Sequence, residues 1–142
     1  MGAATAGDLP AALAFEREHF PGWLAGFERA AAGDAHRVVV LARAATGGVV
    51  GTALVGAPSP AAPPAVIWDA LLGRDTGTIG GVGVAPAARG RGVGLAVAAC
   101  ATEVLRARGA ARSHAGWTWL VDWYGRLGYR PWREYRMSWR RL

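Results

Sequence analysis

The chain has 142 residues, a length that suggests one domain able to bury a core of its own. Hydrophobic residues make up 52%, which argues against global disorder, and a single cysteine, Cys100, leaves no disulfide framework or cysteine-based zinc site. All sixteen basic residues are arginine and the net charge is +6, which favours anionic partners such as a phosphate-bearing molecule.

The sequence also bears on metal binding and on cellular location. The three histidines show no metal-ligand spacing, so no metal is expected. No apolar run is long enough to span a bilayer, and the first residues lack a basic segment followed by an apolar one. The expectation is a cytoplasmic protein that does not bind membranes.

The first part of the chain is predicted to form two helices and a hairpin. Residues 1–7 are small and are expected to be frayed. Asp8 precedes Leu9-Pro10 and is the expected N-cap of a helix that runs to His19. The elements expected next are a helix over residues 23–32 and strands over residues 36–44 and 49–56, joined by a turn at residues 46–48.

The second part is predicted to alternate strands and helices. An Ala/Pro loop over residues 57–64 precedes residues 66–72, which fit a strand or a short helix, and a turn is expected over residues 73–77. The elements expected after it are a strand over 78–84, a helix over 93–108, a strand over 112–116, a helix over 117–127 and one or two strands over 129–142. This order predicts a mixed α/β (α+β) domain with helices packed against one central sheet.

The connection between residues 84 and 94 has the chemistry of a phosphate-binding turn. Glycines allow close backbone approach, a helix N-terminus supplies free N–H groups, and Arg89 and Arg91 add positive charge. A P-loop is excluded because the chain has no lysine. A dinucleotide fingerprint is excluded because its third glycine position falls on Leu95. The remaining alternative is a tight connection with solvated arginines.

Two motifs resemble one family. The run from Arg89 to Gly94 (RGRGVG) matches the pattern R/Q-x-x-G-x-G/A, and the run from Trp123 to Tyr129 (WYGRLGY) is similar to F-Y-x-x-L-G-F. These are motifs of the Gcn5-related N-acetyltransferases (GNAT), and the order of elements agrees from about residue 8 to 142. The resemblance implies a single GNAT-like domain over residues 1–142. Its mixed, mostly antiparallel sheet would be splayed between strands 78–84 and 112–116, flanked by about four helices, with the first strand short or missing.

The resemblance also implies a co-substrate and the residues that hold it. In the family this turn binds the pyrophosphate of acetyl-CoA, and the preceding strand lines the pantetheine arm. The cofactor-binding residues implied here are Val82, Val84, Arg89, Gly90, Arg91, Gly92, Val93, Gly94 and Tyr124.

The resemblance implies a general acid but leaves the base open. Tyr124 matches the tyrosine that protonates the departing CoA thiolate. The family's base is a glutamate on the strand before the turn, where this chain has Gly80 and Gly81. His114, on the strand that flanks the acetyl group, is the candidate base, because imidazole titrates near neutral pH. Asp69 and water are further alternatives.

The leading hypothesis is therefore an acyl-CoA-dependent N-acetyltransferase. It would transfer acetyl groups to a primary amine of a small molecule or peptide by direct attack. One alternative is a degenerate CoA-binding partner or regulatory module, which the glycine-rich strand favours. Another is an arginine-rich nucleic-acid module at the C-terminus, although a solvated sheet face explains those arginines better. Trp119 and Trp123 are expected on one helical face, and the aromatic C-terminal region is compatible with a homodimer.

Overall fold

The computed structural model describes residues 1–58, 72–134 and 138–140 of the chain. Its strands are β1 (Gly2–Ala3), β2 (Arg37–Arg43), β3 (Val49–Gly56), β4 (Thr76–Val84) and β5 (Arg112–Ala115). Its α-helices are α1 (Leu9–His19), α2 (Leu24–Ala31), α4 (Val93–Ala107) and α5 (Val121–Gly125). Two short 3-10 helices, η1 (Ala6–Asp8) and η2 (Pro86–Ala88), precede α1 and α4. The prediction for residues 66–72 lies almost wholly outside the described residues.

The described strands form one sheet in the order β1-β2-β3-β4-β5. The first four strands pair antiparallel, whereas β4 and β5 pair parallel. A parallel pair needs a crossover connection, and α4 supplies it. The mixed, mostly antiparallel sheet confirms the predicted fold class.

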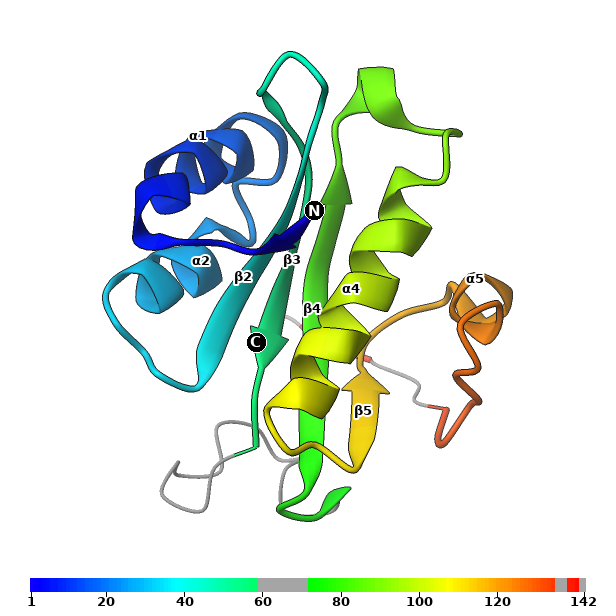
Figure 1. The fold of residues 1–142 in the computed structure, drawn as a ribbon. Coiled ribbons are helices and arrows are strands. Elements are labelled where there is room, and N and C mark those ends of the chain that lie inside the picture. The colour runs from blue at the N-terminus through cyan, green and yellow to red at the C-terminus, as the bar shows by residue number, and fades with distance from the viewer. Residues whose placement is uncertain (59–71, 135–137, 141–142) are drawn as a thin grey trace.

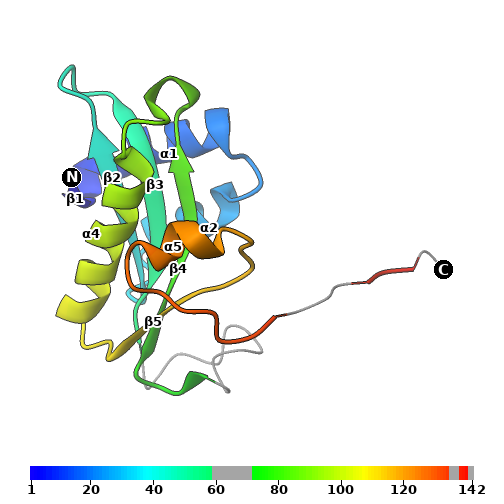
Figure 2. The ribbon, with the colours of Figure 1, turned by 90° about the vertical axis from the view of Figure 1, so that its right-hand side faces the viewer.

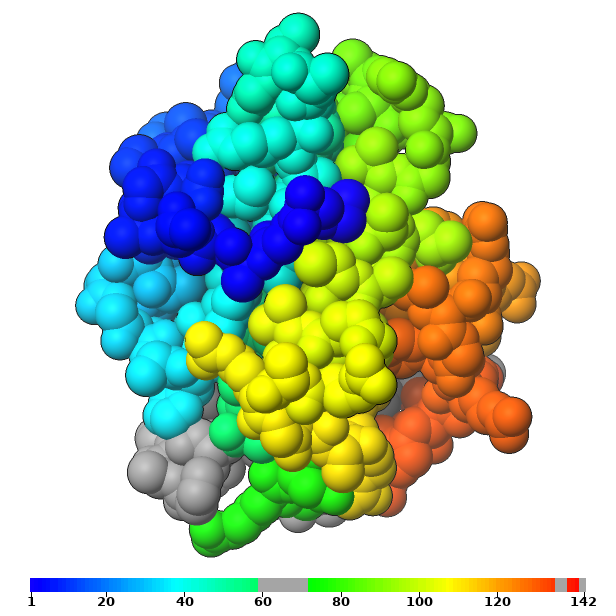
Figure 3. All heavy atoms as spheres, in the orientation of Figure 1, coloured from blue at the N-terminus to red at the C-terminus, as the bar shows by residue number. Residues whose placement is uncertain are grey.

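Helices cover both faces of the sheet, with α1 and α2 on one face and α4 on the other (Figure 1). This explains the continuous apolar run of β2, in which successive side chains enter opposite cores. Val38, Val40 and Ala42 join the core beneath α4, while Val39 and Leu41 join the core beneath α1 and α2. Figure 3 shows α4 lying over its face of the sheet, with the N-terminal segment along one side and the α5 region along the other.

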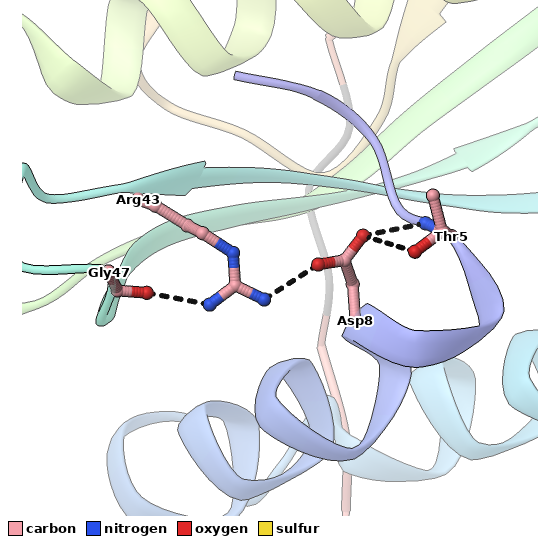
Figure 4. A network of polar contacts seen from close by, with 4 residues as sticks. All are labelled: Thr5, Asp8, Arg43 and Gly47. Atoms are coloured by element: carbon pink, nitrogen blue, oxygen red, sulfur yellow. Dashed lines mark hydrogen bonds and ion pairs between the residues drawn. The ribbon is translucent and has the colours of Figure 1, made fainter.

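The N-terminus is held more firmly than its small residues predict. Residues 2–3 pair with β2, so the first strand is short rather than missing, and the expectation of fraying is wrong for these residues. Asp8 does not cap α1 with its side chain. Its carboxylate instead accepts hydrogen bonds from Thr5 and from Arg43 (2.7 Å), and Arg43 also donates to the Gly47 carbonyl (Figure 4). These contacts tie η1 to the β2–β3 hairpin and hold the pKa of Asp8 well below its usual range.

The C-terminal region differs most from the prediction. The expected helix over residues 117–127 is reduced to Val121–Gly125, and Trp117 has a positive φ of 56°. Trp119 therefore lies outside the helix and shares no helical face with Trp123. The predicted strands over 129–142 are absent from residues 129–134 and 138–140, and residues 138–140 lie away from the sheet (Figure 2). Short-range patterning suggested strands, but residues 129–134 and 138–140 pair with no strand of the sheet.

Candidate active site

The predicted phosphate-binding turn lies between the end of β4 and the start of α4. Gly90 (φ 72°) and Gly92 (φ 78°) both adopt the left-handed conformation that favours glycine. A Cβ atom built on either glycine meets no atom within 4 Å, so the space beside the backbone is open. Arg91 is exposed next to them. The glycines are therefore required by the turn conformation, and they leave the backbone accessible to a ligand.

The start of α4 has the free donors of an anion site. Gly92 is its N-cap, and no side chain caps the helix. The first N–H groups of a helix lack intrahelical acceptors and carry partial positive charge. Among the residues predicted to bind the pyrophosphate, Val93 and Gly94 contribute such groups.

The end of β4 already has a contact with this turn. Arg89 Nε donates to the Val84 carbonyl at 3.1 Å, so the side chain folds back along the strand. Val84 is the residue predicted to offer backbone groups to the pantetheine arm. A carbonyl oxygen can accept two hydrogen bonds, so this contact leaves one acceptor site at Val84.

Close packing at Gly94 brings the two sequence motifs together. A Cβ atom at Gly94 would lie 3.2 Å from Val84 Cγ2 and 3.3 Å from Trp123 Cζ2. The absence of a side chain at Gly94 therefore lets α4, β4 and α5 meet at one point. The residue next to Trp123 is Tyr124, the predicted acid. The structure thus places the predicted turn and the second motif at the same edge of the sheet.

The sheet opens beside this point. The pairing of β4 with β5 ends at Ile79 and Ala115, while β4 continues to Val84. Strand β4 also contains a bulge, since Gly81 and Val82 lie opposite the single β3 residue Ala53. The predicted splay is therefore present. The side chain of Val82 packs against the core beneath α4, so a ligand in the opening would meet its backbone.

Tyr124 is suited to hold a proton at neutral pH. The residue is 8% exposed, and its ring packs edge-on against those of Trp123 and Tyr129. Burial, together with the neighbouring Tyr129, raises the pKa of the Tyr124 hydroxyl. Tyr129 anchors this region, because its hydroxyl lies 2.6 Å from Ser113 Oγ and 3.0 Å from Thr102 Oγ1.

His114 lies in the paired part of β5, opposite Thr78 of β4. Side chains alternate along a strand, and Ser113 turns toward Tyr129 and α4. His114 therefore faces the opposite side of the sheet, where its ring meets that of Trp132 at 6.1 Å. The two predicted catalytic residues, Tyr124 on α5 and His114 on β5, therefore have different neighbours.

The predicted lack of a carboxylate on β4 is correct, but a carboxylate approaches from α1 instead. Glu16 is 0% exposed, and its Oε1 accepts a hydrogen bond from Thr52 Oγ1 at 2.5 Å. Burial raises the pKa of the Glu16 carboxyl from 4.5 to about 7, although the hydrogen bond from Thr52 opposes this shift. Sequence reasoning did not select Glu16. The available signal was its position four residues from both Ala12 and Phe20, within the apolar stripe of the helix.

The described residues show neither a metal site nor a membrane-spanning helix. Residues 1–58, 72–134 and 138–140 contain no group of three or more His, Cys, Asp or Glu side chains that could hold a metal ion. Over the same ranges, no helix is both long enough and apolar enough to cross a membrane.

The turn, the bulged strand and the splayed pair define an acetyltransferase fold in which no side chain caps the start of α4. The profile of the acetyltransferase (GNAT) family matches residues 9–129, so the chain belongs to that family. Its enzyme class is that of an N-acetyltransferase. The sequence matches none of the curated proteins with which it was compared.

Solved structures resemble the chain over most of its length. A GCN5-related glucosamine N-acetyltransferase region of a fungal multi-domain GH3 β-N-acetylglucosaminidase is 30% identical, with a TM-score of 0.77. That match covers 93% of this chain, which spans only 16% of the fungal one. An acetyltransferase from Trypanosoma brucei is 23% identical with a TM-score of 0.63, covering 97% of this chain and 96% of that one. AAC(6')-Iy, solved with a bisubstrate analogue of CoA, is 16% identical with a TM-score of 0.67, covering 99% and 96%.

Proposed function

We propose that the chain transfers an acetyl group from acetyl-CoA to a primary amine of a small molecule or peptide. The single observation that carries this proposal is the convergence of the glycine turn, the uncapped start of α4 and the Trp123–Tyr124 segment at the end of β4, beyond its pairing with β5. Family membership makes acetyl transfer the reaction class, and this convergence supports CoA as the group that binds.

The residues of the turn fit the CoA pyrophosphate. Gly90 and Gly92 keep the backbone uncovered, the N–H groups of Val93 and Gly94 supply donors, and Arg89 and Arg91 supply charge. Acetyl-CoA would bring a thioester whose carbonyl carbon accepts the amine. Backbone groups of Val82 and Val84 would orient the pantetheine arm along β4.

Tyr124 would supply the proton for the sulfur of the departing thiol. Its raised pKa keeps the hydroxyl protonated, and this hydroxyl makes no hydrogen bond within the described residues, so it remains available as a donor. Positioned acids of this kind contribute roughly 100-fold or more to rate.

An amino sugar is the acceptor class with which to begin. The fungal region that is 30% identical is named as a glucosamine N-acetyltransferase. A first panel would therefore contain glucosamine, an aminoglycoside, a polyamine and a peptide with a free N-terminus.

Two measurements test the proposal in sequence. Calorimetric titration with acetyl-CoA should give saturable binding, and its absence would remove both the enzyme and a CoA-binding partner as readings. Release of free CoA thiol with the amine panel should then separate an active enzyme from a degenerate module that binds CoA without turnover. That degenerate alternative is favoured by Gly80, Gly81 and Gly83, which leave β4 without a carboxylate.

The acid role has its own variant. Tyr124→Phe should lower kcat while acetyl-CoA affinity is retained, because only the hydroxyl is removed. An unchanged kcat would take the role of acid away from Tyr124 and leave the ring as packing.

Two further parts of the proposal concern the setting of the enzyme. The exposed Trp119 and Trp139 are compatible with a homodimer formed through the C-terminal region, which light scattering after size-exclusion chromatography would test. A cytoplasmic location is proposed as well, and fluorescence microscopy of a tagged chain would test it.

A further inference from the structure

Glu16 is a carboxylate buried without full hydrogen bonding. Its Oε1 accepts from Thr52 Oγ1, whereas Oε2 is buried and has no partner among the described residues. An unsatisfied buried oxygen costs free energy, so in a native protein it calls for a reason. A water molecule or a substrate that donates a hydrogen bond would provide one.

The position of Glu16 relates it to the open end of β4. Thr52, its partner on β3, is paired with Gly83 of β4. The ring of Phe20, one turn along from Glu16, packs directly on Gly83 on the same face of the sheet. Glu16 therefore lies beside the segment between the bulge and Val84, on the face opposite α4.

Aromatic rings cluster next to Glu16 along the chain. Phe15 and Phe20 lie 5.8 Å apart, and Trp23 stacks on Phe20 at 4.9 Å. Phe20 and Trp23 belong to the short connection between α1 and α2, and Trp23 is partly exposed. A cluster of rings near a carboxylate is suited to an amine, because rings bind the alkyl part and also attract cations.

The electrostatic surroundings of Glu16 contain no countercharge. Strands β3 and β4 carry no ionisable side chain. On the other packed elements, Asp8 pairs with Arg43, and Asp34 pairs with Arg37. The side chains of Arg17, Glu18, Glu28 and Arg29 are exposed. His19 pairs with Glu18 and lies against an aromatic ring. The acidity of Glu16 is therefore set by its burial and by Thr52 alone.

We propose that Glu16 is the proton acceptor for the amine substrate, an inference that rests on the proposed N-acetyltransferase function. Oε2 takes one proton from the acceptor's ammonium group, directly or through one water molecule. The nitrogen lone pair then forms the C–N bond to the acetyl carbon, and the C–S bond breaks. The sulfur takes a proton from Tyr124, which regains one from the nitrogen, and Glu16 releases its proton to solvent. The net reaction liberates one proton with each amide formed.

The first experiment compares Glu16→Gln with the exposed control Glu18→Gln. Glutamine keeps the shape and accepts the hydrogen bond from Thr52 but cannot take a proton. With the panel amine of highest turnover, kcat/KM of Glu16→Gln should fall on the order of 100-fold, with the acetyl-CoA dissociation constant within about twofold of wild type. Glu18→Gln should match the wild type in both. An unchanged kcat/KM in Glu16→Gln overturns the proposal.

The second experiment uses Thr52→Val, which leaves the carboxyl in place. The hydrogen bond from Thr52 favours the ionised form, so its loss should raise the pKa of Glu16. The acid limb of kcat/KM, expected near pH 7 in the wild type, should move to higher pH. NMR titration of carboxyl-labelled glutamate in the ligand-free protein should show the same upward movement. A limb that does not move in Thr52→Val overturns the proposal, even if Glu16→Gln fails to fold or to bind acetyl-CoA.

Failure of the proposed function and failure of the role of Glu16 give different experimental results. If the wild type itself turns over no amine, the proposed function fails and the role of Glu16 falls with it, before any variant is needed. If the wild type is active and the Glu16 and Thr52 variants behave as the wild type does, only the role of Glu16 is rejected, and the proposed function stands.

Discussion

The two faces of β4 carry candidate sites that are built from different chemical groups. On the face of α4, the candidate CoA site is made of backbone: glycines with positive φ, an uncapped helix start and exposed arginines. On the face of α1 and α2, the site is made of side chains: a buried carboxylate, a threonine and a cluster of aromatic rings. The first face fits a ligand shared by many enzymes, whereas the second is where a particular amine would be selected and deprotonated.

This contrast shows how an acetyltransferase can function without a carboxylate on β4. Strand β4 has glycine at the positions where aromatic side chains on the face of α1 and α2 pack against it. Gly81 lies against Phe27, and Gly83 lies against Phe20. The carboxyl group that β4 lacks is provided by α1, one strand away.

The largest expected effect concerns the pH dependence of stability and tests the side-chain face. Glu16 has a pKa raised to about 7 in the folded protein against 4.5 when unfolded, so the folded state binds the proton more tightly. Its contribution is therefore most favourable below pH 4.5 and is lost as the pH rises through about 7. The loss amounts to about 3 kcal/mol. Denaturant unfolding across this range should show the slope in the wild type and lack it in Glu16→Gln. An equal slope in both proteins would show that Glu16 is not buried as described.

The next effect tests the backbone face. Gly92→Val should weaken acetyl-CoA binding by about 100-fold, or about 2.7 kcal/mol, because a branched side chain at positive φ would distort and cover the turn. Gly109→Val is the matched control, since Gly109 has a φ of 85° and open space at the other end of the α4 segment. Both variants should lose similar stability, but only Gly92→Val should lose affinity in calorimetry. Equal affinity in the two variants would refute the assigned turn.

A smaller effect separates the glycines of β4 from one another. Gly83→Ala should cost about 2 kcal/mol, because its methyl group would overlap the Phe20 ring. Gly80→Ala should change stability by less than about 0.5 kcal/mol, since no atom lies within 4 Å of the added carbon. Thermal or denaturant unfolding of the pair measures the difference. Equal losses would mean that Phe20 does not pack on β4 in solution.

The smallest effect concerns the C-terminal tryptophans. Trp119 is 88% exposed, so Trp119→Ser should alter stability by less than about 0.5 kcal/mol. Phe27→Ala, which empties a fully buried site, should cost about 3 kcal/mol or more. A large loss in Trp119→Ser, measured at a concentration where the wild type is monomeric, would place this side chain in a core.

Local patterns predicted the elements whose determinants are close in sequence. The bounds of α1 and β3 agree with the prediction, and α4 ends within one residue of it, because apolar periodicity and flanking glycines act over a few residues. Strand β4 begins two residues earlier than predicted, since pairing with β5 recruits Thr76 and Gly77 from the expected turn. The C-terminal strands were predicted from alternating aromatics and arginines, a pattern that cannot form a strand without a neighbour to pair with.

By itself, the sequence determined the family, the order of the main elements and the glycine turn, because each depends on residues adjacent along the chain. Only the tertiary structure decided what faces the open end of β4. Glu16 and Thr52 are 36 positions apart, and burial between helix and sheet, rather than the identity of glutamate, raises the pKa of the carboxyl. Desolvation depends on everything that surrounds a group, so it becomes visible only when the chain is folded.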